Sequence, residues 1–95
     1  MATGTIRAPA RAVHVEARRA TFSIQAGGVG TVSLDVYKQG YTAVGIAGVE
    51  VNNNHVMIYR WYVSANNANM QLQNSMTTAY TDIPVIFYVL YVKND

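Results

Sequence analysis

The feature that most constrains this chain is a run of ten residues, 83–92 (IPVIFYVLYV), which carries no charge until Lys93. Its β-branched and aromatic side chains, with Pro84 near the start, favour a strand over a helix. Successive side chains of a strand point to opposite faces. One face would therefore hold Ile83, Val85, Phe87, Val89 and Tyr91, and the other Ile86, Tyr88, Leu90 and Val92. Both faces are apolar, whereas a sheet with one solvated side shows clean alternation.

A chain of 95 residues has little material with which to cover two apolar faces. This length suggests a single domain. The hydrophobic fraction is 51% and the charged fraction 13%, about half of the roughly 25% that is usual for soluble proteins. We therefore expect copies of the chain to cover apolar surface for one another, in a homo-oligomer.

Charge and cysteine content exclude several classes of protein. The net charge is only +2, and four of the seven basic residues lie in the first twenty positions. The rest of the chain is nearly neutral, which argues against a general nucleic-acid surface. The chain has no cysteine, so it has neither disulfides nor thiolate metal ligands. No apolar run approaches the roughly 18 residues that span a bilayer, so we expect no membrane insertion.

The N-terminal part divides into an arm and the start of a fold. Residues 1–11 lack periodicity and are expected to form an arm or linker, while residues 12–95 form one β-sandwich domain. Apolar residues alternate over residues 13–17 and again, on the opposite parity, over residues 22–26. This change of parity predicts a bulge or turn near residues 18–20, between two short strands. A helix over residues 10–20 is the alternative.

The remaining segments read as strands separated by turns. Gly27 to Gly30 form a turn rather than a phosphate-binding loop, because no helix start follows them. Gly45 and Gly48 mark a bulge or a close backbone approach. Regularly spaced strands with turn signals between them indicate an all-β fold, an antiparallel β-sandwich of jelly-roll-like type. The expected strands cover residues 31–37, 41–51, 55–64, 69–74 and 83–92, with a loop at residues 75–82.

The strand at residues 55–64 is the second one that is apolar on both faces. Strict alternation places Met57, Tyr59, Trp61 and Val63 on one side and Val56, Ile58 and Tyr62 on the other, with Arg60 as the exception. Arg60 is expected either to pair with an acidic residue across a subunit boundary or to be solvated.

No arrangement of residues predicts catalysis. The five acidic residues are scattered through turns and strand exteriors, and His14 and His55 lack metal-binding spacing. No serine lies in a nucleophile-elbow context. The sequence therefore predicts a non-enzymatic protein without a metal or cofactor. A metal site assembled by folding or by a symmetry axis is the alternative.

Asparagine-rich turns on either side of an aromatic strand suggest a glycan site. Side-chain amides can bond to sugar hydroxyls, and aromatic rings can stack on the apolar face of a sugar. The simpler reading is that asparagine forms turns and Trp61 belongs to the core. Because the turns bracket one strand, we expect two patches at opposite ends. The candidate ligand-binding residues are Asn52, Asn53, Asn54, Tyr59, Trp61, Asn66, Asn67 and Asn69.

Four segments of the chain form a familiar pattern: GYTAVGIAGV at residues 40–49, Tyr59 together with YVSANNA at residues 62–68, LQN at residues 72–74 and FYVLYVK at residues 87–93. They resemble a β-rich C-terminal domain of tail-fibre and receptor-binding proteins from phages and prophages of gut bacteria. The resemblance implies a trimeric fibre tip, a virion protein outside the cell, which adheres to bacterial surface polysaccharide or protein.

Burial around a threefold axis agrees with two strands that are apolar on both faces. The expected trimer interface consists of Ile86, Tyr88, Leu90, Val92, Ile58 and Tyr62. Two alternatives to receptor binding remain: a purely structural trimerisation cap of a fibre, and a monomeric carbohydrate-binding module.

Overall fold

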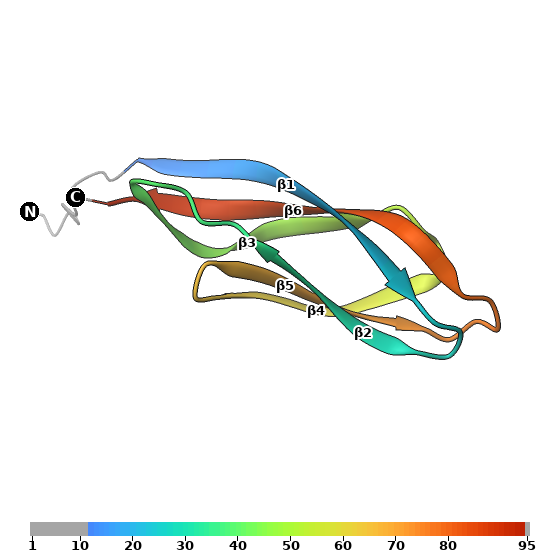
Figure 1. Cartoon of the computed structure of the whole chain (residues 1–95). Helices are drawn as coiled ribbons and strands as arrows, with labels where there is room; N and C mark the ends of the chain where they lie inside the picture. Colours follow the sequence, from blue (N-terminus) through green and yellow to red (C-terminus); the bar gives the residue numbers. More distant parts are fainter. Residues whose placement is uncertain (1–11, 95) are drawn as a thin grey trace, which may run out of the picture.

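The computed structural model describes residues 12–94, so the arm predicted at residues 1–11 lies outside the described part. That part consists of six strands and contains no helix (Figure 1). The all-β prediction is confirmed. The strands are β1 (Val13–Ile24), β2 (Val29–Asp35), β3 (Tyr41–Val51), β4 (Val56–Ser64), β5 (Asn67–Asn74) and β6 (Tyr80–Lys93).

The strands form two antiparallel sheets of three strands each. Sheet A has the order β1–β6–β3, and sheet B has the order β2–β5–β4. The two sheets pack on each other as in a β-sandwich, with extents of 61 × 29 × 19 Å along the principal axes. The long axis follows the strands, and β6 and β5 are the central strands of the two layers.

The core lies between β6 and β5. The predicted inner face of the last strand is confirmed, because Ile83, Val85, Phe87, Val89 and Tyr91 are each at most 3% exposed. On β5, Met70 and Leu72 are fully buried while Gln71 and Gln73 lie on the outer side, as the alternation predicts. This arrangement removes from water the apolar side chains that dominate the stability of a small domain.

The break predicted near residues 18–20 is wrong, and so is the alternative helix. β1 runs without interruption from Val13 to Ile24 and pairs with β6 along its whole length. Apolar residues change parity because Val13 and Val15 lie on the outer face of the sheet, while Phe22 and Ile24 lie on the inner face. One irregularity occurs between Phe22 and Ile24, where β6 carries an extra residue at Asp82, with φ of 52°.

Strict alternation along β4 is also wrong. A register shift between Ile58 and Arg60 makes Tyr59 an extra residue in the strand. Trp61 therefore pairs with the buried Met70 and shares the inner face with Ile58, although the alternation placed these two residues on opposite sides.

The glycines of β3 mark bulges, as predicted. Register shifts occur immediately before Gly45 and immediately before Gly48, so each glycine follows an extra residue. The turn between β1 and β2 is confirmed, and Gly27 there has a φ of +65°, which favours glycine. β2 begins at Val29, slightly earlier than the sequence suggests.

The loops gather at the two ends of the long axis. Val13 pairs with Val92 and Tyr41 with Lys93, so β1 begins, β3 begins and β6 ends at one end. The opposite end, which we call the loop end, carries the connections at residues 25–28, 52–55 and 75–79. The β4–β5 hairpin lies at the first end.

Candidate functional site

Four of the six residues predicted for the trimer interface lie on the outer face of sheet A. Ile86, Tyr88, Leu90 and Val92 project from the central strand on the side away from the core, and each is only half-buried. On the neighbouring strand β1, the side chains level with Val92 and Leu90 are those of Val13 and Val15, which are 64% and 50% exposed. The outer face is therefore an apolar surface that no other layer formed by residues 12–94 covers.

Two other residues predicted for the interface lie elsewhere. Ile58 packs against the core between the sheets. Tyr62 pairs with Asn69 on the outer face of sheet B, where the Arg60 guanidinium lies over its ring at 4.5 Å. Arg60 thus contacts Tyr62 in its own chain. β4 belongs to sheet B, and its bulge puts Ile58 and Tyr62 on opposite faces of that sheet. The six predicted residues therefore do not form one surface.

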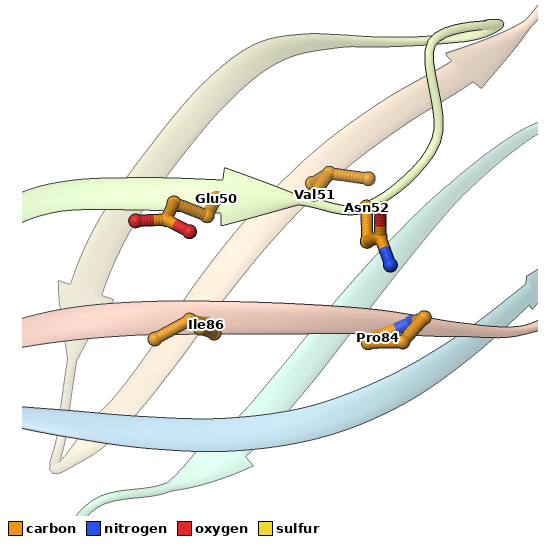
Figure 2. Close-up of a pocket in the computed structure, with 5 residues that line it drawn as sticks. All are labelled: Glu50, Val51, Asn52, Pro84 and Ile86. Carbon is orange, nitrogen blue, oxygen red and sulfur yellow. The ribbon is translucent and has the colours of Figure 1, made fainter.

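Open pockets flank the central strand of sheet A near Pro84. Figure 2 shows the first, between Glu50 and Asn52 on the β3 side and Pro84 and Ile86 on β6. The second lies on the β1 side, and Arg19 and Thr21 line it together with the same part of β6. The apolar outer face thus has polar and charged margins at this end.

Tyr88 and Glu50 are joined across β6 and β3. The Tyr88 hydroxyl donates a hydrogen bond of 2.7 Å to Glu50 Oε2. This bond raises the pKa of the Tyr88 hydroxyl above its ordinary value, because ionised tyrosine cannot donate it. Glu50 is therefore oriented on the outer face of sheet A while remaining exposed.

The loop end brings part of the predicted ligand-binding set beside an aromatic pair. Asn52 and Asn54 are exposed there. The His55 ring stacks on Tyr80, with centroids 5.8 Å apart and an interplanar angle of 12°. Asn53 has a structural role, since its Oδ1 accepts a hydrogen bond of 2.8 Å from the backbone N–H of His55.

A buried asparagine that the sequence did not single out braces the same end. Asn74 is fully buried, and its Nδ2 donates to the carbonyl oxygens of Gln25 at 3.0 Å and Thr78 at 2.8 Å. Its Oδ1 accepts from the N–H of Met76 at 3.0 Å. One side chain thereby fixes two loops relative to each other.

The second asparagine group lies at the opposite end, as expected. Asn66 sits in the β4–β5 hairpin with φ of 65°, and its carbonyl oxygen accepts from Val36 N–H. Asn69 is 8% exposed, accepts from the Ser33 hydroxyl and donates to the Asn67 carbonyl. Asn66 and Asn69 thus have structural roles, while the Asn67 side chain is exposed.

The two candidate aromatic residues of β4 are accessible. Tyr59, at the bulge, is 55% exposed. Trp61 points to the inner side of sheet B, yet it is 45% exposed because β4 is an edge strand. Neither ring lies beside the exposed asparagines at the loop end, so the predicted ligand set is divided over several regions.

An ionic cluster lies on the inner side of β1, near its start. Glu16 Oε1 contacts His14 Nε2 at 3.0 Å and Lys38 Nζ at 3.3 Å, and Oε2 contacts Arg18 at 2.6 Å. The hydrogen bond with His14, together with the two cations, lowers the pKa of Glu16. These contacts hold the Glu16 carboxylate in its ionised form and occupy both of its oxygens. Glu16 is therefore suited to a structural role and not to accepting a proton in catalysis.

Among residues 12–94 no group of three or more metal-ligating acidic, histidine or cysteine side chains occurs. The described chain also lacks a helix with the length and apolar character needed to cross a membrane. No protein-family model matches this sequence, and neither the curated proteins nor the solved structures gave a match.

Proposed function

We propose that this chain is a non-enzymatic adhesion module, the trimeric tip of a phage tail fibre that binds a polysaccharide receptor on the bacterial surface. The observation that carries the proposal is the apolar outer face of sheet A, which no other described part of the chain covers. Protein surfaces of this kind commonly mark interaction sites. A virion location outside the cell follows from the same proposal.

The arrangement of strands supports a jelly-roll-like scaffold for this role. The first strand, β1, pairs with the last, β6, and the second strand, β2, pairs with the last but one, β5. Such pairing belongs to the Greek-key and jelly-roll types of β-sandwich. A rigid scaffold of this kind presents loops for recognition.

The trimer would form about an axis parallel to β6, with three outer faces of sheet A turned toward it. Each copy would then bury Leu90 and Val92 against its neighbours. The loop end, with Asn52, Asn54 and the His55–Tyr80 pair, would be presented at one end of the assembly. Recognition would use amide hydrogen bonds and ring stacking on a sugar.

Light scattering on the full chain at micromolar concentration tests the assembly. We expect the mass of three chains. Leu90→Asp should reduce the mass to that of one chain, because it places a charge in the apolar interface. The matched control is Gln73→Asp, on the exposed outer side of sheet B, which should remain trimeric. A wild-type chain that stays monomeric would overturn the proposal.

Binding to host cells and to a glycan array tests recognition. Asn52→Ala/Asn54→Ala should weaken binding, whereas Asn67→Ala, at the other end, should leave it unchanged. If the wild-type trimer binds neither cells nor glycans, the chain is instead a structural trimerisation cap.

The exposure of Tyr59 and Trp61 favours a second candidate, a monomeric carbohydrate-binding module. It predicts that a bound sugar shields Trp61 from a fluorescence quencher and that the chain scatters light as a monomer. Shielding of Trp61 in a monomer would select this function over the fibre tip.

A further inference from the structure

Arg19 and Glu50 occupy the two margins of the outer face of sheet A at the same height. In the register, Arg19 pairs with Ile86 on one side of β6, and Glu50 pairs with Ile86 on the other. Side chains of directly paired residues point to the same face of a sheet. One row across the sheet therefore runs from a cation on the β1 margin, through an apolar residue, to an anion on the β3 margin.

Both charges retain bonding capacity. Within residues 12–94 Arg19 forms no ion pair, and its side chain lines the open pocket beside β6. Glu50 uses Oε2 for the Tyr88 hydroxyl, while its Oε1 accepts no hydrogen bond from another described residue. A guanidinium can donate to such a carboxylate oxygen in a charge-assisted bond.

Cyclic symmetry about an axis parallel to β6 places all copies at the same height. The β1 margin of one copy then faces the β3 margin of the next, because these strands are the opposite edges of sheet A. We propose that a second copy of this chain docks there, with Arg19 of one protomer bonded to Glu50 of its partner. This inference rests on the proposed trimer and names the contact that sets its register.

An apolar contact lies further along the same margins. Val15 of β1 is level with Leu90 and with Gly45 of β3, and the bulge residue Val44 beside that glycine is 52% exposed. A Cβ added at Gly45 would meet nothing within 4 Å. The β3 margin thus offers space for Val15 of the neighbouring copy, at the height that the Arg19–Glu50 pair requires.

A shift of one copy along the axis would lose both contacts. A displacement of two residues toward the start of β1 or away from it would place Arg19 opposite Gly48 or Asn52 instead of Glu50. Charges at an interface contribute specificity in this way, by penalising the wrong register.

Charge reversal tests the contact in the full chain. Arg19→Glu and Glu50→Arg should each raise the dissociation constant of the trimer about tenfold or more, because each places like charges together. The double variant Arg19→Glu/Glu50→Arg should recover wild-type association. Arg60→Glu is the matched control, because it reverses a charge on the outer face of sheet B, away from both margins of sheet A. It should associate as the wild type does.

An equimolar mixture of the two single variants gives a second readout. The Arg19→Glu chain is acidic at positions 19 and 50, and the Glu50→Arg chain is basic at both. A ring of one chain of each kind would therefore pair opposite charges at both of its contacts. A ring of three would keep one like-charge contact, so the mixture should recover trimer only in part. Full recovery with the mass of two chains would support the contact and overturn the trimer.

Failure of this inference is distinguishable from failure of the proposed function. If the wild type is trimeric and both single variants assemble equally well, the Arg19–Glu50 contact is wrong and the trimer stands. If the wild type is monomeric, both proposals fall. Circular dichroism of each variant verifies that a loss of mass does not reflect unfolding.

Discussion

Tyr91, near the end of the central strand of sheet A, donates its hydroxyl hydrogen to the backbone carbonyl oxygen of Val36, which follows β2 in sheet B. Both residues are fully buried. The bond therefore joins the two layers where the β2–β3 connection crosses between them, and it satisfies a carbonyl that has no access to water.

Tyr91→Phe should lower the free energy of unfolding by about 1–2 kcal/mol, because it leaves the buried Val36 carbonyl without a donor. Urea unfolding at one fixed protein concentration, followed by Trp61 fluorescence, measures the change. Tyr37→Phe is the matched control, since Tyr37 is 61% exposed, and it should stay within about 0.5 kcal/mol of the wild type. Equal stability of the two variants would contradict a stabilising role for the bond.

Alkaline pH should destabilise the fold through the same residue. Burial raises the pKa of Tyr91 above 10.0, the ordinary value expected in the unfolded chain. A group whose pKa is raised by folding stabilises the fold fully when the pH is below the pKa that the group has in the unfolded chain. This stabilisation is lost as the pH rises through the higher pKa of the folded chain. The urea midpoint should therefore fall above about pH 10 in the wild type, and the fall should be smaller in Tyr91→Phe. Identical pH profiles would count against this assignment.

Acid should weaken the ionic cluster on β1. The hydrogen bond with His14, followed by Lys38 and Arg18, lowers the pKa of Glu16 below 4.5. The resulting stability is fully present when the pH is above the pKa that Glu16 has in the unfolded chain. It is lost as the pH falls through the lower pKa that Glu16 has in the folded chain. Glu16→Gln should cost less than about 1 kcal/mol at neutral pH. Its unfolding curve should approach that of the wild type in acid, and a constant difference at all pH values would argue against ionisation as the cause.

Asn74→Ala should be the most damaging change outside the apolar core. It removes three hydrogen bonds to backbone groups of the loops at residues 25–28 and 75–79. These three bonds are part-buried, and each such bond contributes about 0.5–1.5 kcal/mol, so we expect a loss of about 1.5–4.5 kcal/mol in urea unfolding. Gln73→Ala, one residue earlier and exposed, should change stability by less than about 0.5 kcal/mol.

Substitutions on the two faces of β6 should have different effects. Phe87→Ala removes a fully buried ring and should cost about 3–5 kcal/mol in unfolding free energy. Leu90→Ala, on the half-buried outer face, should mainly weaken association, as measured by light scattering. If Leu90→Ala destabilised the fold as much as Phe87→Ala and left the mass unchanged, the outer face would have no role in assembly.

Most of the strands could be predicted because alternation and turn residues are local signals. Residues 41–51 and 83–92 show this, since their β-branched content and flanking turns need no partner to be recognised. The glycines of β3 marked its bulges for the same reason. Asn74 could not be found in this way, because its partners lie in two loops that only folding brings to it.

Bulges without a glycine account for the wrong assignments. The extra residue at Tyr59 moves Trp61 to the inner side of sheet B. No glycine or other bulge signal occurs beside Tyr59 in the sequence, so this shift could not be predicted. The continuity of β1 was missed for a related reason. Its apolar residues lie on the outer face at the start of the strand and on the inner face at its end. In the sequence alone, this change of parity looks the same as a break between two strands.

The amino-acid sequence alone determined that the last strand would have two apolar faces, because side-chain direction in a strand follows from residue number. Only the tertiary structure decided which face sheet B covers and which the described residues leave open. It also set Arg19 and Glu50 level with each other on opposite margins of the open face. Pairing register joins residues that are distant in sequence, and its energy is shared over the whole ladder, so no local pattern encodes it.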